Sequence, residues 1–227
     1  MLRAITAGTF LMLVQMSSAS GACNFGSNHA LQPHGLIGQT WEKLGGEQSA
    51  LGCPTTGEIN SESPGKVQSY QYGQISWSQG RGNHAILVAQ QAGPKSVELF
   101  WFGVEPFNYD FWIVRTDTNG VNIDQEDVKV DRTNGYFVFR KAQLGETYSF
   151  VVEGCDEVGI GEGAKARCRQ HWLNRVAVKI QPSSHKKNPT FADPPKRGTA
   201  CWLDLNCIKN AVKEGSDFVK IIAAASG

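Results

Sequence analysis

The chain has 227 residues, of which 22 are Lys or Arg and 21 are Asp or Glu, so its formal net charge is +1. A net charge this close to zero argues against a protein that binds nucleic acid or another polyanion non-specifically. Glycine is frequent, with 25 residues, and aromatic residues make up 10% of the chain. We therefore expect a turn-rich, strand-rich protein with aromatic cores and no nucleic-acid partner.

Residues 1–19 have the layout of a secretory signal peptide. Arg3 supplies one positive charge, residues 4–14 are apolar, and small residues follow. This order predicts export, with cleavage after Ala19 or, alternatively, after Ala22. The apolar run is shorter than the roughly 20 residues that cross a bilayer, so no transmembrane segment is expected. The mature protein is predicted to be secreted, either extracellular or associated with a cell wall.

Six cysteines remain after this signal. An even number in an exported chain favours disulfide bonds, and six cysteines allow fifteen connectivities. Their order along the chain suggests three local pairs, which are Cys23–Cys53, Cys155–Cys168 and Cys201–Cys207. No pair has the Cys-x-x-Cys spacing of a zinc site and no matching His cluster is present, so neither a metal nor another cofactor is predicted.

The first segment, residues 24–91, contains one helical pattern and three short strands. Residues 35–44 place four apolar side chains on one helical face: Leu36, Ile37, Trp41 and Leu44. Residues 65–72 alternate as a strand does, with inward candidates Val67 and Tyr70 or Tyr72. Two further strands are expected at residues 73–78 and 84–88. The pattern predicts a small α+β unit of one helix and a short hairpin.

Four separated motifs in this segment resemble one copy of the LGFP repeat, over about residues 35–88. They are Trp41-x-x-Leu44-Gly45-Gly46, Leu51-Gly52-Cys53-Pro54-Thr55, Tyr70-x-x-Gly73-x-Ile75-x-Trp77-Ser78 and Gly82-x-His84-Ala85. Cys53 occupies the aromatic position of the family's naming tetrapeptide, which suggests that a disulfide replaces a packing contact. The family usually occurs in tandem, whereas this chain has a single copy. The resemblance implies a non-catalytic module of exported proteins that associates with cell-wall material.

Aromatic and polar residues of the expected hairpin form a candidate saccharide site. Sugar rings stack their C–H faces on aromatic rings, and their hydroxyls bond to amide, imidazole or guanidinium groups. The hairpin and its turn carry both kinds of side chain: Tyr70, Tyr72, Gln74, Trp77, Arg81 and His84. The alternative for Trp77 and Tyr72 is that they fill the core of a small unit with few large residues.

The second segment, residues 93–182, consists of short strands separated by turn signals. Strands are expected at residues 96–102, 108–116, 136–140, 148–153 and 175–180, with a weaker pair within 121–130. Short strands at this spacing predict a β-sandwich.

Three features of this segment resemble a fibronectin type III domain with a disulfide-tied last loop. Trp101 ends an early strand, and Leu144-x-x-x-Tyr148 has the spacing of a tyrosine corner. Cys155 and Cys168 lie where the loop between the last two strands would be stapled. A nearby basic group could contact acidic glycans, or could simply be solvated: Lys165, Arg167, Arg169 and Arg175.

The third segment begins with a linker rich in Pro and Lys, residues 183–200. Residues 201–227 follow with apolar positions at three- and four-residue steps, which predicts an amphipathic helix. This helix is expected to dock on the sandwich, and the alternative is a membrane surface.

The expected fold class is mainly β: a small α+β LGFP-like unit, a fibronectin type III-like sandwich and the C-terminal helix. The chain lacks a Gly-x-Ser-x-Gly elbow, a zinc-protease motif and a nucleotide-binding glycine pattern, so no enzyme is predicted. The expected function is non-catalytic association with cell-wall or extracellular polysaccharide. The alternatives are a protein–protein interaction module acting through the sandwich, and a small hydrolase or inhibitor.

Overall fold

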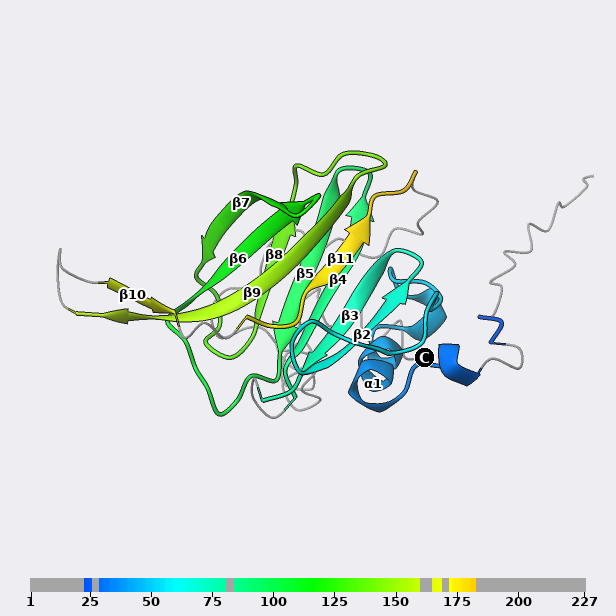
Figure 1. The fold of residues 1–227 in the computed structure, drawn as a ribbon, viewed down its shortest axis with the longest axis horizontal. Coiled ribbons are helices and arrows are strands. Elements are labelled where there is room, and N and C mark those ends of the chain that lie inside the picture. The colour runs from blue at the N-terminus through cyan, green and yellow to red at the C-terminus, as the bar shows by residue number, and fades with distance from the viewer. Residues whose placement is uncertain (1–22, 26–28, 81–83, 160–164, 169–171, 183–227) are drawn as a thin grey trace, which may run out of the picture.

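The computed structural model describes residues 23–25, 29–80, 84–159, 165–168 and 172–182 (Figure 1). The expected signal peptide, linker, C-terminal helix and Cys201–Cys207 pair lie outside these residues, as do Arg81 and Arg169. The described chain is mainly β, with two antiparallel sheets and few helical residues. Each helix in this part is too short or too polar to span a bilayer.

Sheet A has the strand order β1-β2-β3-β4-β5-β8. Its strands are β1 (Ile59–Asn60), β2 (Gly65–Tyr70), β3 (Gly73–Ser78), β4 (Ile86–Gly93), β5 (Ser96–Phe102) and β8 (Gly135–Phe139). Sheet B has the order β10-β9-β6-β7, with β11 also paired to β9. Its strands are β6 (Phe111–Thr118), β7 (Val121–Val128), β9 (Thr147–Val158), β10 (Lys165–Cys168) and β11 (Val176–Lys179).

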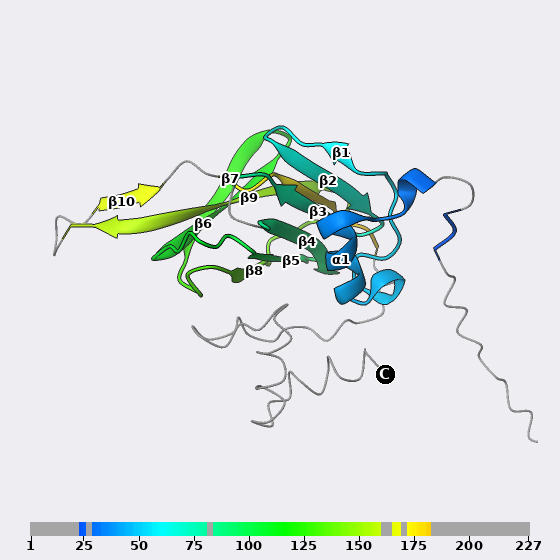
Figure 2. The same cartoon turned by 90° about the horizontal axis from the view of Figure 1, so that it is seen from below.

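Helix α1 (Gly35–Lys43) packs against sheet A on the face opposite sheet B, and two 3-10 turns flank it at His29–Leu31 and Gly46–Gln48 (Figure 2). The predicted apolar helix face is confirmed. Ile37 is buried, and Leu36, Trp41 and Leu44 pack against the same cluster.

The central strands of sheet A are buried on both faces, because successive side chains alternate between two cores. In β4, Leu87 and Ala89 enter the core shared with sheet B, whereas Ile86 and Val88 enter the core beneath α1. In β5, Trp101 enters the core shared with sheet B, and Phe100 enters the core beneath α1. The molecule therefore has three layers: α1 with its loops, sheet A, and sheet B.

The expected boundary at residues 91–93 falls within β4, and sheet A is continuous across it. Strand β3, in the LGFP-like segment, pairs with β4, and β4 pairs with β5 of the expected sandwich. The local patterns that identified the strands carry no information about which strand edges meet. The hairpin and the sandwich thus share one sheet.

Several element boundaries differ from those expected. Residues 121–128 form one strand, not a weak pair, and β9 has 12 residues. Strand β10, which no sequence pattern indicated, pairs with the far end of β9. Its short polar sequence lacks the apolar alternation of a half-buried strand because both its faces are largely exposed.

Two of the three cysteine pairs suggested by chain order lie in the described part, and both are disulfide-bonded. Cys23–Cys53 ties the beginning of the described chain to the LGFP tetrapeptide, and Cys155–Cys168 links β9 to β10. These bonds are consistent with an oxidising, extracellular location.

One buried carboxyl group, that of Glu98, is expected to make the protein less stable as the pH rises, whereas most carboxyl groups make a protein less stable as the pH falls. Glu98 of β5 is 3% exposed and accepts a hydrogen bond from Gln90 Nε2 at 3.0 Å. Burial raises the pKa of Glu98, against the lowering effects of hydrogen bonds from Gln90 and Tyr136 and of the charge on Arg140. The folded state therefore binds this proton more tightly than the unfolded state.

The stabilising effect of the Glu98 proton is complete below the unfolded-state pKa and disappears as the pH rises through the folded-state pKa. We expect Glu98→Gln to be more stable than the wild type at pH 8 and to lose this advantage towards pH 4. Urea unfolding at several pH values measures the difference. Glu105→Gln, which removes an exposed carboxylate and not a buried one, is the control for the loss of one negative charge.

Candidate functional site

A cavity of about 270 Å³ lies between the beginning of α1 and the hairpin, and we call it the Trp77 cavity. Its lining comes from α1, the segment leading into β1, β2 and β3: Gly35, Leu36, Ile37, Glu58, Lys66 and Trp77. Antiparallel pairing sets Lys66 directly opposite Trp77, so both side chains lie on the α1 face of sheet A.

The beginning of α1 leaves this cavity open. Gly35 has φ +54°, a left-handed conformation that glycine adopts without strain, and no atom lies within 4 Å of where a Cβ would be. Leu36 and Ile37 then supply apolar side chains to the wall. Trp77 is only partly buried, so its indole is both packed and accessible.

Two charged groups of opposite sign line the same cavity. The Glu58 side chain is 12% exposed, and one of its oxygens lies 3.4 Å from His34 Nε2. The Lys66 ammonium donates to Asn60 Oδ1 at 2.6 Å. An aromatic surface beside a carboxylate and an ammonium suits a ligand with one apolar face and several hydroxyl or amide groups.

Tyr70 belongs to the core beneath α1 and does not line this cavity. It is 4% exposed, its ring stacks on Trp41 at a centroid distance of 6.2 Å, and its hydroxyl donates to Gln68 Oε1 at 3.2 Å. Burial raises its pKa, and the charge of Glu58 raises it further. Tyr70 therefore remains a neutral phenol within this core.

Tyr72 and Gln74 do not share the surface of Trp77. Gln74 lies on the opposite face of β3, where its amide donates to Ser69 Oγ and accepts from the Ala177 N–H. Tyr72 precedes β3, whereas the exposed His84 lies beyond its other end, two residues before Ile86, which pairs with Trp77. Six strand residues separate these ends by roughly 17 Å. A single saccharide platform made of Tyr72, Gln74, Trp77 and His84 is thus not formed.

Lys66 could have been identified from the hairpin register, since it pairs with Trp77. Glu58 carries no comparable signal. It lies in an irregular segment, and only the path of that segment over the sheet brings its carboxylate to the cavity.

Each residue of the LGFP tetrapeptide has a structural role. Leu51 is fully buried in the core beneath α1, and the Gly52 carbonyl accepts a hydrogen bond from Trp41 Nε1 at 3.0 Å. Gly52 has φ +68°, and a Cβ there would meet the Gln71 side chain. Cys53 forms its disulfide, and Pro54 bridges to Tyr70. The tetrapeptide thus builds the support of the site and does not line it.

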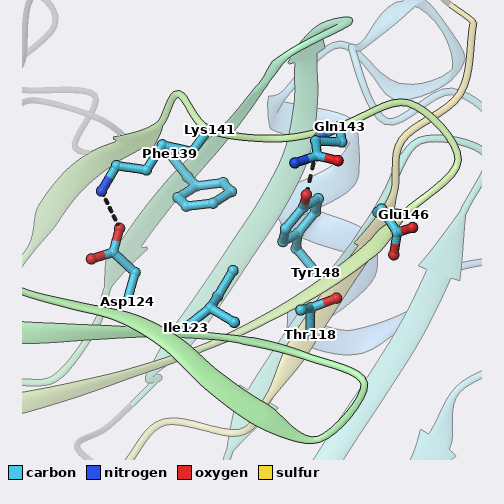
Figure 3. Close-up of a pocket in the computed structure, with 8 residues that line it drawn as sticks. All are labelled: Thr118, Ile123, Asp124, Phe139, Lys141, Gln143, Glu146 and Tyr148. Atoms are coloured by element: carbon cyan, nitrogen blue, oxygen red, sulfur yellow. Dashed lines mark hydrogen bonds and ion pairs between the residues drawn. The ribbon is translucent and has the colours of Figure 1, made fainter.

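A second cavity, of about 340 Å³, opens between β7 and the connection from β8 to β9 (Figure 3). The Lys141 ammonium and an Asp124 oxygen, 2.7 Å apart, span one side of it. The Tyr148 hydroxyl accepts a hydrogen bond from the Gln143 N–H at 3.0 Å on the other side. Its polar groups are largely engaged with one another, and its aromatic residues Phe139 and Tyr148 are buried.

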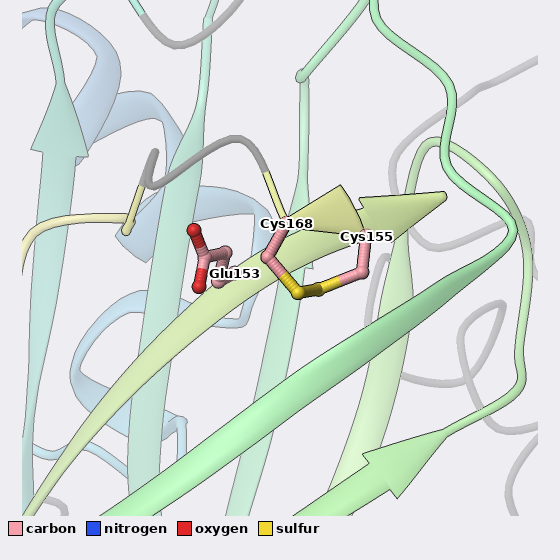
Figure 4. A group of neighbouring side chains, drawn as sticks. All are labelled: Glu153, Cys155 and Cys168. Carbon is pink, nitrogen blue, oxygen red and sulfur yellow. A yellow bond between two sulfur atoms is a disulfide. The ribbon is translucent and has the colours of Figure 1, made fainter. Parts of the chain in front are cut away.

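Glu153, Cys155 and Cys168 lie close enough together to resemble a metal site (Figure 4). The two sulfur atoms are joined in a disulfide, so neither is available as a thiolate ligand. A single carboxylate does not make a metal site.

Comparison with protein families identifies one module within the chain. No curated protein matches the chain. Residues 51–90 match the family described as the LGFP repeat, a stretch that runs from the tetrapeptide through β2 and β3 into β4. These residues include Glu58, Lys66 and Trp77 of the cavity, so the chain carries an LGFP repeat at its candidate site.

Proposed function

We propose that this is a secreted, non-catalytic binding protein that associates with cell-wall or extracellular polysaccharide through the Trp77 cavity. The observation that carries the proposal is the partly exposed indole of the LGFP repeat, flanked by Glu58 and Lys66 in one cavity. The disulfides support export, because such bonds persist in oxidising compartments.

The cavity offers the contacts that a sugar unit requires. The C–H face of a pyranose stacks on the Trp77 indole, its hydroxyl or amide N–H groups donate to Glu58, and its ring or hydroxyl oxygens accept from Lys66. The carboxylate and the ammonium lie on the same sheet face as the ring, so one sugar can contact all three.

We further propose that residues 86–180 form a fibronectin type III-like sandwich that acts as a spacer or second contact surface. One layer consists of β4, β5 and β8. The other consists of β7, β6 and β9, with β10 and β11 both paired to β9, and this two-layer arrangement supports the assignment. The buried Trp101 and the Tyr148–Gln143 hydrogen bond agree with the expected positions. Leu144 departs from them, since it is 59% exposed.

Trp77→Ala is expected to weaken retention on insoluble cell-wall glycans by about tenfold or more, because stacking on an aromatic ring contributes most in a partly desolvated site. Tyr72→Ala is the matched control: it removes a partly buried aromatic ring from the other end of β3 and should change retention by less than about twofold. Thermal unfolding of both variants separates binding from stability.

Glu58→Gln and Lys66→Met test the polar contacts in the same pull-down and should each reduce retention. If wild type and Trp77→Ala are retained equally, or if neither is retained on any wall fraction, the Trp77 cavity is not a polysaccharide site.

A further inference from the structure

The distal half of β9 and all of β10 form an arm that projects beyond the body of the protein (Figures 1 and 2). The Cys155–Cys168 disulfide joins the two strands at its base. Near the base, the Glu157 N–H donates to Asp110 Oδ2 at 3.0 Å, and its carboxylate pairs with Lys129 at 2.8 Å. These contacts hold the arm in a defined direction relative to sheet B.

The outer strand of this arm presents two positive charges on one face. Lys165 pairs with Val158 and Arg167 with Asp156, two positions apart, so both basic side chains share a face of the hairpin. Both residues are exposed. Arg175, which the sequence placed in the same basic group, instead bonds to the buried Asp117.

Strand β7 forms the opposite edge of sheet B, and it is acidic. Glu126 pairs with the core residue Val114, so its side chain lies on the face of β7 that leads to the core, yet it is exposed. Asp127 pairs with Ile113 and lies on the other face. Asp124 shares the face of Glu126 but is already paired with Lys141.

Among the described residues, β7 pairs only with β6, and β10 only with β9. Each strand therefore has one side without a neighbouring strand, which is the arrangement that favours strand addition. Lys165 and Arg167 continue the same sheet face as Val158 and Asp156, and this face follows the core-side face of β9. The basic edge strand, β10, and the acidic edge strand, β7, thus present their charges on the same side of sheet B.

We propose that β10 of one copy adds to β7 of a second copy, so that sheet B continues between molecules. Adjacent strands run antiparallel from β10 through β9 and β6 to β7, so β10 and β7 run in opposite directions. Two copies in the same orientation therefore meet in an antiparallel pair, with Lys165 and Arg167 facing Glu126. Opposite charges at facing positions stabilise such pairs.

The distribution of charge also favours pairing of β10 with β7 over pairing of either strand with its own copy. Pairing of β7 with β7 would oppose acidic residues, and pairing of β10 with β10 would oppose basic ones. Three of the five exposed large apolar side chains in the described chain lie on these two strands or the arm: Val121, Ile123 and Val158. The contact joins two different surfaces of the same chain, so its repetition can build assemblies larger than a dimer, as open chains or closed rings.

Sedimentation of the full-length mature protein at low salt, over a range of concentrations, tests the proposal. We expect a mass that increases with concentration and decreases with added salt. Glu126→Lys should weaken association about tenfold or more, whereas Asp127→Lys, the same charge change on the other face of β7, should have a much smaller effect.

Charge reversal provides the decisive comparison. The double variant Lys165→Glu with Arg167→Glu should not associate, and adding Glu126→Lys to it should restore association, because the facing charges are again opposite. Lys43→Glu with Lys95→Glu, two exposed sites elsewhere, controls for net charge. A wild type that is monomeric at all concentrations, equal effects of Glu126→Lys and Asp127→Lys, or a triple variant that stays monomeric would each overturn the proposal.

Discussion

Replacing Asp117 by Asn is expected to lower the free energy of unfolding by about 2–4 kcal/mol. The Asp117 side chain is 3% exposed and lies 2.7 Å from both Arg115 Nε and Arg175 Nη1. The variant leaves two guanidinium groups beside a neutral amide. The estimate lies at the low end for a broken buried ion pair, because both arginine side chains remain about one third exposed.

The same substitution should change how stability depends on pH. Burial raises the pKa of Asp117, but hydrogen bonds and charges from Arg175 and Arg115 outweigh burial, so the pKa lies below its usual value. The stability that Asp117 contributes is present above its unfolded-state pKa of about 3.9 and disappears as the pH falls through the lower folded-state pKa. The advantage of the wild type over Asp117→Asn should therefore decrease in acid, whereas for Glu98→Gln it is the variant that loses its advantage over the wild type there.

Glu62→Gln provides the control for the same cluster. Glu62 is 81% exposed and lies 3.7 Å from Arg175 Nε, so its removal should cost less than about 0.5 kcal/mol. Urea unfolding at pH 7 measures both variants. Similar losses for Glu62→Gln and Asp117→Asn would contradict a dominant role for the buried carboxylate.

Local sequence patterns predict much of the secondary structure of this protein. Strands β3 and β5 have the boundaries expected from alternation and flanking glycines, and α1 differs from its prediction by one residue. The two disulfides of the described chain join neighbouring cysteines, which chain order alone suggested. These features depend on residues that are close in sequence.

The arrangement of the sheets depends on contacts that local patterns do not encode. Nothing in the sequence of β4 shows that its two edges join the LGFP repeat to the sandwich. The faces on which Gln74 and Trp77 lie can, however, be predicted from the sequence. Gln74 and Trp77 are three residues apart in one strand, and alternation alone places them on opposite faces. Glu58 was missed because an irregular segment, and no periodic element, brings it to Trp77.

Hydrogen bonds connect the hairpin of the LGFP repeat to the segment that precedes β11. Ser76 and Ser78, on the sandwich side of β3, bond through their hydroxyl groups to the main chain of Asn174 at 2.7 Å. The Asn174 side-chain amide donates to the carbonyls of Trp77 at 2.9 Å and Pro64 at 3.2 Å. Asn174 thus connects to residues about one hundred positions earlier in the chain.

Asn174→Ala is expected to lower the free energy of unfolding by about 2–4 kcal/mol, since it deprives two main-chain carbonyls of a donor at a residue that is 3% exposed. Asn122→Ala is the matched control: Asn122 is exposed on β7 and accepts a single local hydrogen bond from the Asp124 N–H. Its loss should cost about 0.5 kcal/mol or less.

Because sheet A runs through both parts of the molecule, the effect of Asn174→Ala should reach all of it. We expect one unfolding transition at a lower denaturant concentration, and a matching decrease in hydrogen-exchange protection for α1, β3, β5 and β9. Loss of protection in α1 and β3 alone, with β5 and β9 unchanged, would show instead that the LGFP repeat unfolds independently. A single cooperative unit would mean that the repeat that lines the Trp77 cavity does not unfold separately from the strands of sheet B.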